Sequence, residues 1–507
     1  MKKLVILRRI SQAAFLTLFI YILWSTTYPL KAAVSPSAFF RIDPLVIITT
    51  SVSERVLLPG LAASFAMLVL TLVFGRFFCG WVCPLGAAID IAGARESLKK
   101  PENDKANTVV RKPKFFILGI IGFFAAAGLQ LAWILDPIVI MARFVSLNLI
   151  PTVTLTLNSL FVILIRNLGM HGYVQDLYRS LKGTVLGIKV YYFSHSALIF
   201  LFFIVICALA LLKRRLWCRS VCPLGALYAL FARFALLGRT VKGCVECGIC
   251  RADCRMGAIK EDTSYVKGEC ILCMDCVYNC PKHITRFGFS GPGGAEDPKP
   301  QDNAPGSGIS RRQFMALALS SVFLTGFRFG KRLRPSYSNV IRPPAALKEE
   351  EFLDRCIRCG NCMKVCITNG LQPVLLKAGV EGIWTPELVP EMGYCEYQCT
   401  LCGNTCPTGA IPPLTVEKKR LVRLGTAEID RSICIPWAEG KECIVCEEFC
   451  PVAQKAIKLK KEPSGASVVS KPYVSEDLCV GCGICQAKCP VRPARAIRVS
   501  PRNSDRT

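Results

Sequence analysis

Cysteine is the residue type with which this chain could carry out chemistry, because 29 of its 507 residues are cysteines and most stand in groups of four. Two groups follow one another closely, as CVECGICRADC and CILCMDCVYNCP. In this C-x2-C-x2-C-x3-C spacing, three thiolates bind one cubane iron–sulfur cluster and the fourth binds the partner cluster. Zinc ribbons need only two pairs of ligands, so the spacing predicts two [4Fe-4S] clusters that exchange Cys254 and Cys280. Their ligands are Cys244, Cys247, Cys250, Cys254, Cys270, Cys273, Cys276 and Cys280.

The same pattern returns four times beyond residue 345, which makes six motifs in all. The enlarged first gap of the third group, IPWAEGKE, makes Cys434 the least secure ligand. The four motifs can pair either in sequence or nested, the first group with the fourth and the second with the third. We favour the nested pairing. The predicted ligands are Cys356, Cys359, Cys362, Cys366, Cys395, Cys399, Cys402, Cys406, Cys434, Cys443, Cys446, Cys450, Cys479, Cys482, Cys485 and Cys489.

Four further cysteines belong to an internal repeat, in which FFCGWVCPLGA (77–87) matches LWCRSVCPLGA (216–226). A duplicated helix pair ending in Cys-x3-Cys-Pro is the simplest account. If the last turn is helical, the two cysteines of each copy lie on one face. Together the pairs would form one four-thiolate site for zinc, for Cu(I) or for a seventh iron–sulfur cluster, whereas the alternative is two helix ends with small packing residues. We favour a joint metal site, with ligands Cys79, Cys83, Cys218 and Cys222.

The repeat also places two aspartates in matching positions, because FRIDPLVII (40–48) is similar to WILDPIVIM (133–141). Asp43 and Asp136 each precede a proline, which is typical of a helix N-cap with proline at the first helical position. An ionisable residue at membrane depth is also a functional candidate. We favour the capping role, but keep Asp43 and Asp136 as candidate catalytic residues that accept protons from a quinol.

Apolar segments must position these side chains, and four of them approach the ~20 residues that a bilayer requires. These segments are 12–30, 57–74, 115–135 and 195–212. The basic N-terminus, the loop 95–114 and the residues after Arg214 fall on one side, which the positive-inside rule places in the cytoplasm. The stretch 155–165 is predicted to be too short to span the membrane and to be interfacial or re-entrant. If it did span, the orientation of every later segment would be reversed.

A twin-arginine export pattern lies in the middle of the chain, in ISRRQFMALALSSVFLTGF (309–327). No Ala-x-Ala cleavage site follows, so we expect residues 314–330 to remain as a fifth anchor. The alternative is a membrane-surface helix, which the basic residues after the apolar run favour and which would leave all six clusters in the cytoplasm. The predicted domains are a membrane domain at 1–236, a 2[4Fe-4S] ferredoxin module at 237–287, a linker at 288–308, the signal or anchor at 309–330, and a four-cluster module at 345–498.

These elements predict a multi-domain fold, with an α-helical membrane bundle of four to five spans, a ferredoxin-like module and a second, four-cluster ferredoxin-type module. The formal net charge of +27 does not indicate nucleic-acid binding. Six cubanes, each held by four thiolates and carrying about −2, would lower the charge to about +15, and much of the remainder flanks apolar spans. With only three histidines, the chain is not expected to hold a membrane haem by itself.

Two family resemblances cover nearly the whole chain. Residues 1–290, with both Cys-x3-Cys-Pro motifs and the first ferredoxin motifs, resemble NapH. Residues 308–495, with the twin-arginine start, RPPAALKEEEFLDRCIRCGNC and four cluster motifs, resemble NapG and MauM. The chain is similar to a fusion of the two, which would explain an export signal in its middle. The resemblance implies an electron-transfer component of the bacterial inner membrane, with the first ferredoxin module in the cytoplasm and the C-terminal module in the periplasm.

The leading hypothesis is a membrane-bound iron–sulfur protein that links the quinone pool to a periplasmic oxidoreductase. The expected partners are quinol, a periplasmic reductase or dehydrogenase, a c-type cytochrome and membrane lipid, and whether the chain itself oxidises quinol is left open. The alternative is an assembly factor that reduces copper or another metal centre, since a cytochrome-oxidase assembly factor also combines Cys-x3-Cys-Pro spans with a ferredoxin. The four extra clusters favour electron transfer. A redox-sensing regulator lacks support, because no sensory domain is evident.

Overall fold

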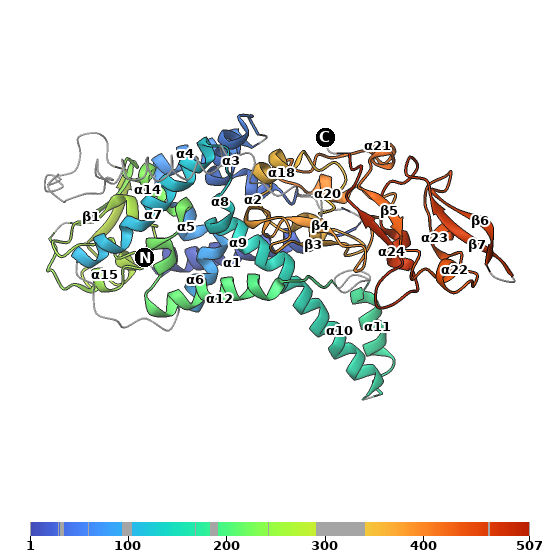
Figure 1. Ribbon diagram of the computed structural model, residues 1–507. Coiled ribbons are helices and arrows are strands. Elements are labelled where there is room, and N and C mark those ends of the chain that lie inside the picture. Colours follow the sequence, from blue (N-terminus) through green and yellow to red (C-terminus); the bar gives the residue numbers. More distant parts are fainter. Residues whose placement is uncertain are drawn as a thin grey trace. The chain divides into compact units, whose positions relative to one another are not determined.

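The computed structural model describes residues 2–28, 30, 35–58, 60–93, 104–167, 169–182, 191–241, 243–289, 340–464 and 467–505. These residues form two compact units (Figure 1). Unit 1 takes its residues from 1–22, 37–144 and 198–332, and unit 2 from 23–36, 145–197 and 333–507. The twin-arginine segment at 309–330 lies outside the described residues.

Unit 1 is mainly helical, and the two copies of the repeat have the same order of elements. In each copy an apolar helix is followed by a short helix with the first cysteine and by a helix that begins after the second cysteine. These are α4 (Leu61–Phe74), α5 (Phe77–Trp81) and α6 (Pro84–Ala92), and then α12 (Ser196–Leu212), α13 (Leu216–Ser220) and α14 (Pro223–Ala232). The remaining helices before α12 are α1 (Lys2–Ser25), α2 (Ala38–Arg41), α3 (Pro44–Glu54), α7 (Asp104–Ala126), α8 (Ala132–Leu135) and α9 (Pro137–Phe144), with the end of α1 in unit 2.

Two helices of the described chain are long and apolar enough to cross a membrane, Lys3–Ser25 and the 30-residue run Pro137–Arg166. That run joins α9 to the π-helical turn η1 (Val145–Leu149) and to α10 (Ile150–Arg166). The prediction for 155–165 is therefore wrong about length, because the residues upstream continue the same helix. Helices α4 and α12 lie in predicted spans but have only 14 and 17 residues. A bundle of four or five spans is not established by these lengths.

A small ferredoxin-like region completes unit 1. Strands β1 (Leu237–Val241) and β2 (Thr285–Phe289) pair antiparallel, with Leu237 opposite Phe289. The predicted linker at 288–308 therefore begins too early, because residues 288 and 289 belong to β2. Between the strands lie α15 (Ile249–Ala252), the 3-10 turn η3 (Lys267–Glu269) and α16 (Asp275–Tyr278). Ile259 and Val277 pack with the cysteines in one small core.

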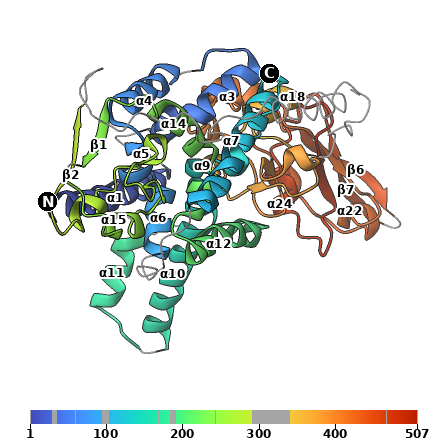
Figure 2. The same ribbon diagram turned by 90° about the vertical axis from the view of Figure 1, so that its left-hand side faces the viewer.

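Unit 2 contains a helical hairpin and a cluster-binding region. Helices α10 and α11 (Tyr173–Leu181) lie side by side in the hairpin, where the rings of Phe161 and Tyr178 stack at 5.1 Å (Figure 2). Antiparallel strand pairs join β3 (Leu371–Pro373) to β4 (Pro386–Leu388), β5 (Thr426–Ile429) to β8 (Ile497–Ser500), and β6 (Ile457–Ser464) to β7 (Ser467–Val474). The helices of the cluster-binding region are α18 (Glu349–Arg355), α19 (Asn361–Lys364), α20 (Leu401–Asn404), α21 (Val416–Leu421), α22 (Ile435–Ala438), α23 (Val445–Glu448) and α24 (Ile484–Lys488).

Candidate iron–sulfur and thiolate sites

All six ferredoxin motifs have the same local structure, because the third cysteine of each lies on a short helix. These helices are α15 and α16 in unit 1 and α19, α20, α23 and α24 in unit 2. A cysteine on the first turn of such a helix faces backbone N–H groups that have no intrahelical partner. The positive end of the helix therefore favours a thiolate and a negatively charged cluster at this place.

In unit 1 the fourth cysteines are exchanged between the two motifs, as the spacing predicts. One cavity of about 130 Å³ is lined by Cys244, Cys247, Cys250 and Cys280. Cys254 instead interacts with the cysteines of the second motif, Cys270, Cys273 and Cys276. The structure therefore forms two groups of four thiols, which is the donor set of two cubanes.

In unit 2 the motifs pair in sequence, so the nested pairing that we favoured is wrong. One pocket is lined by Cys356, Cys359, Cys362 and Cys406, and another by Cys434, Cys443, Cys446 and Cys489. The other two groups are Cys366 with Cys395, Cys399 and Cys402, and Cys450 with Cys479, Cys482 and Cys485. The ligand that the spacing supported least, Cys434, thus lies with three other cysteines.

The reason for this pairing is that each pair of motifs has its own apolar core. Phe352 packs with Ala410 and Ile411 beside the first two motifs. Ala427 and Ile497 pack beside the last two, where β5 precedes the third motif and β8 follows the fourth. Such a strand pair closes one compact module around two motifs, which a nested arrangement would not allow.

The two modules of unit 2 meet at a cysteine backbone contact. The backbone N–H of Cys395 donates to the carbonyl oxygen of Cys482 at 2.8 Å. Their thiols also interact electrostatically. The second and fourth motifs are therefore neighbours, and the four groups of thiols form a continuous series through this unit.

The four cysteines of the repeat also meet in unit 1. Cys79, Cys83, Cys218 and Cys222 are buried and line one small cavity. The cysteines of a copy do not share a helix face, contrary to the prediction. Cys83 and Cys222 are instead the N-caps of α6 and α14, because the prolines after them start new helices. Each Sγ accepts a hydrogen bond at 3.3 Å from a glycine N–H, that of Gly86 or Gly225.

Two buried arginines beside this cavity were missed in the sequence analysis. Arg76 and Arg215 stand three residues before Cys79 and Cys218, so the repeat itself was the signal that could have revealed them. Arg215 donates to the carbonyl oxygen of Cys79 at 2.8 Å, which belongs to the other copy. Arg76 interacts with Cys222 and Cys218 of the other copy, and its Nε and Nη2 are buried without a hydrogen-bond acceptor among the described residues.

This donor set fits a cubane. Four thiolates around a [4Fe-4S] core carry about −2, and the two buried guanidinium groups place positive charge beside them, although each also pairs with a carboxylate. The two glycine N–H groups add hydrogen bonds to thiolate sulfur, a contact that tunes such clusters. When bound, the cluster would supply one-electron transfer at this point. Among the described residues, no three His, Cys, Asp or Glu side chains form a group that could hold a single metal ion.

The second ferredoxin motif packs directly against this thiolate site. A Cβ at Gly80 would lie 2.1 Å from the carbonyl oxygen of Ile271, the residue after Cys270. Trp81 Nε1 donates to Leu272 O at 3.0 Å. The backbone next to Cys79 therefore contacts the backbone next to Cys270, which gives a short path for electrons between the two cysteines.

A buried carboxylate reinforces the same contact. Glu269 is 3% exposed and pairs with Arg76 at 2.9 Å and with Lys114 at 2.5 Å. Burial alone would raise the pKa of Glu269, but the charges of Lys114 and Arg76 outweigh it and hold this pKa below its usual range. The carboxylate is therefore ionised at neutral pH, and losing either cation would leave a buried charge unpaired.

Gly80→Ala should weaken this packing, because no side-chain movement can remove a clash between a Cβ and a backbone oxygen. We expect destabilisation of about 1–3 kcal/mol, concentrated in the contact between α5 and the ferredoxin-like region. Limited proteolysis should cut residues 237–289 faster in the variant. Gly122→Ala is the matched control, since a Cβ there meets no atom within 4 Å. Equal proteolysis of both variants would show that the contact is not tight.

The paired aspartates are N-caps, and they also face each other. Asp43 Oδ1 accepts from the N–H of Leu45 at 3.0 Å, and Asp136 Oδ1 accepts from Ile138 at 2.9 Å. Both carboxyl groups are fully buried and lie within hydrogen-bonding reach of each other. Each Oδ2 lacks a donor among the described residues. Two buried carboxylates this close cannot both ionise, so one shared proton would satisfy both outer oxygens.

Tyr228 lies near both the aspartates and the thiolate site and was also missed in the sequence analysis. It interacts electrostatically with Asp43, with Asp136 and with the thiols of Cys79 and Cys83. Its hydroxyl is buried and has no hydrogen-bond partner in the part of the chain that is described. No sequence signal marks it, since the first copy of the repeat has Ile89 at the matching position.

These sites define an iron–sulfur protein of the ferredoxin class, and comparison with known proteins agrees. Residues 56–101 and 196–242 match one family described as a 4Fe-4S binding domain, and residues 472–493 match another. Apart from Cys207, the cysteines within the first match are the four of the thiolate site. No solved structure matches the chain.

Relatives of known name cover part of the chain. The methylamine utilization ferredoxin-type protein MauM of Methylophilus methylotrophus is 32% identical over 38% of this chain and 85% of its own length. The ferredoxin-type protein NapG of Escherichia coli K12 is 34% identical over 32% of this chain and 70% of its own length. An uncharacterized protein of Methanocaldococcus jannaschii is 29% identical over 57% of this chain and 98% of its own length. Through part of its length, the chain belongs to the family of MauM and NapG ferredoxin-type proteins, and its function is iron–sulfur electron transfer.

Proposed function

We propose that this protein takes electrons from membrane quinol and delivers them through its clusters to an oxidoreductase in the periplasm. The observation that carries the proposal is the thiolate site, which joins an apolar helical region to the first pair of clusters through Gly80 and Trp81. Each quinol would lose two electrons and two protons and become quinone. Two [4Fe-4S] clusters would each accept one electron, and the protons would pass to water by way of protein carboxyl groups.

An N-terminal half of NapH type, four or five spans and a location in the inner membrane are parts of this proposal. The contacts of Lys364 support a periplasmic position for the C-terminal module. Lys364 is 1% exposed, and its Nζ donates to the carbonyl oxygens of Trp24 at 2.9 Å and Thr26 at 2.8 Å. These carbonyls lie at the end of α1, whose basic start is expected in the cytoplasm.

Metal analysis tests the cofactor content. Six motifs predict about 24 irons per chain, and a cubane at the thiolate site raises this to about 28. Protein purified without oxygen should contain equal amounts of iron and acid-labile sulfide. Zinc in place of iron would contradict the ferredoxin assignment, whereas stoichiometric copper with about 24 irons would favour the alternative, an assembly factor that reduces a metal centre.

A reporter that is active only in the periplasm tests the sidedness. Fused after residue 345 the reporter should be active, and fused near residue 295 it should be inactive. Changing Arg311 and Arg312 together to lysine should hold the C-terminal module inside the cell, because the export pathway recognises paired arginines. Protection of the wild-type C-terminal module from protease in spheroplasts would contradict export.

A further inference from the structure

A cavity in unit 1 combines a cationic wall with an apolar one. It has a volume of about 470 Å³ and lies between α1, helix α6 and the residues just before α13. Its charged lining consists of Asp90 and five arginines, Arg8, Arg9, Arg214, Arg215 and Arg255. Leu16, Ala87 and Ile91 belong to its apolar lining, and Ile91 is 68% exposed.

The carboxylates around this cavity already form ion pairs with arginines. Asp90 pairs with Arg215 at 2.7 Å and with Arg255 at 3.2 Å, and it accepts from Gln12 at 2.9 Å. Burial alone would raise the pKa of Asp90, but the charge of Arg215 outweighs it and holds this pKa well below its usual range. Asp275 pairs with Arg255 at 2.5 Å. The Asp90 carboxylate is therefore ionised and shared among several cations.

Two of the five arginines still offer N–H groups to an anion. Within the described part of the chain, Asp90, Asp275 and Asp253 pair with Arg8, Arg214, Arg215 and Arg255. Arg8 is 1% exposed, and its Nε is buried without a hydrogen-bond acceptor in the described structure. Arg9 is exposed and makes no ion pair with any described residue. The cavity thus offers guanidinium N–H groups that an additional anion would satisfy.

We propose that this cavity binds the phosphate of an anionic phospholipid, with an acyl chain along Leu16 and Ile91. Guanidinium groups match phosphate oxygens in geometry and charge. Basic pockets between helices on the cytoplasmic side of a membrane are known to hold such head groups. Free phosphate would not use the apolar wall, and a neutral quinone would leave the charge of Arg9 unbalanced. The inference rests on the membrane location in the proposed function, but not on quinol oxidation.

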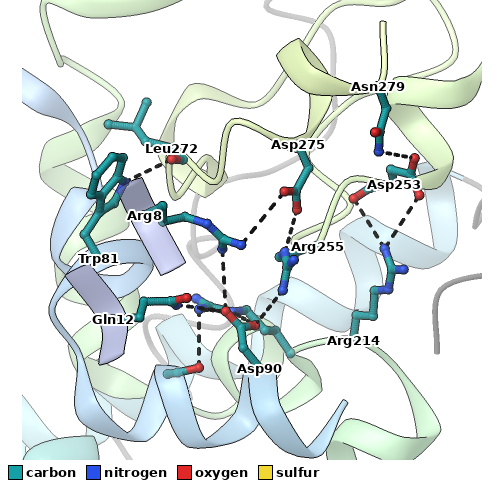
Figure 3. Close-up of polar contacts among 12 residues, drawn as sticks. Arg8, Gln12, Trp81, Asp90, Arg214, Asp253, Arg255, Leu272, Asp275 and Asn279 are labelled. Carbon is teal, nitrogen blue, oxygen red and sulfur yellow. Dashed lines mark hydrogen bonds and ion pairs between the residues drawn. The ribbon is translucent and has the colours of Figure 1, made fainter. Parts of the chain in front are cut away.

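The bound lipid would also support the contact with the ferredoxin-like region. Arg8 and Arg255 line the cavity and both pair with Asp275, which lies between Cys273 and Cys276 (Figure 3). A phosphate at these arginines would hold them in place against Asp275. Lipid composition would therefore affect how firmly the second ferredoxin motif is held.

The test uses the full-length protein in nanodiscs with phosphatidylcholine alone or with added phosphatidylglycerol. Native mass spectrometry should detect retained phosphatidylglycerol, bound about tenfold more tightly than phosphatidylcholine. The double variant Arg9→Gln/Arg214→Gln should lose this preference. Both side chains reach the cavity without being buried, so the fold should tolerate the change. Arg179→Gln is the control, since that side chain is 70% exposed on α11.

Several outcomes would overturn the inference. These are equal retention of the two lipids, an unchanged preference in the double variant, displacement of lipid by millimolar inorganic phosphate, or displacement by a quinone. Quinol-dependent cluster reduction is measured on the same samples. If the wild-type protein prefers phosphatidylglycerol but shows no quinol-dependent cluster reduction, the proposed function alone is contradicted. If it shows quinol-dependent cluster reduction but no lipid preference, the lipid site alone is contradicted.

Discussion

Changing Cys83 and Cys222 to serine is expected to remove the cluster that we propose for the thiolate site, while leaving the fold and the six proposed ferredoxin-type clusters in place. Serine is a good N-cap, so its oxygen can still accept from the N–H of Gly86 or Gly225. Serine lacks the thiolate sulfur that holds iron in such clusters and is a poorer ligand for them. The iron content should therefore fall from about 28 to about 24 per chain.

The same double variant should interrupt electron flow. If the thiolate site lies between the quinol and the first ferredoxin clusters, quinol-dependent cluster reduction should fall by about a hundredfold or more. Reduction by dithionite, which reaches exposed clusters directly, should be unchanged. Cys207→Ser is the control, because Cys207 lies on α12 and does not line the thiolate cavity. An unchanged iron content with loss of bound copper or zinc would mean that this site holds a different metal.

The sequence predicted the groups of cysteines well, because cubane ligation needs a fixed local spacing. The exchange of Cys254 and Cys280 followed from that spacing alone. The meeting of the four repeat cysteines followed from the duplication. In contrast, the pairing of the last four motifs depends on which apolar residues share a core, as Phe352 and Ile411 do. That information is not local, so the nested pairing could not be rejected from motif spacing.

Other features could not be predicted because they depend on contacts between distant segments. Arg76 looks like a basic residue flanking a span, yet it is fully buried and pairs with Glu269, almost two hundred residues later. The turn between Cys79 and Cys83 was wrongly predicted to be helical because Pro84 was taken to end a helix. In the structure Pro84 begins the next helix. The long helix Pro137–Arg166 was missed because its apolar pattern is interrupted by polar residues such as Asn148.

Asp43→Asn and Asp136→Asn separate the capping role of these residues from a role in proton transfer. The asparagine oxygen can still accept from the backbone N–H groups at the start of α3 or α9, so the helices should be retained. The amide cannot take up a proton. Any loss of rate at constant stability would therefore come from the missing carboxyl group.

The buried position of the pair explains why that group should matter. An electron that enters the thiolate site adds negative charge where water cannot screen it. An aspartate pair that shares one proton can accept a second and offset this charge, and Tyr228 interacts with both the pair and the thiols. Because both aspartates are 0% exposed, they would act on the electron-transfer step rather than by touching quinol.

Each single variant is expected to slow quinol-dependent cluster reduction by about a hundredfold, the usual range for losing a proton-transfer group. The rate should also lose its dependence on pH, which a purely structural defect would not cause. Iron content and melting temperature should stay at the wild-type values. Asp176→Asn provides the control, because that carboxylate is 72% exposed on α11. Wild-type rates and a wild-type pH profile in both variants would leave Asp43 and Asp136 with the capping role alone, because helix capping needs only the oxygen that asparagine keeps.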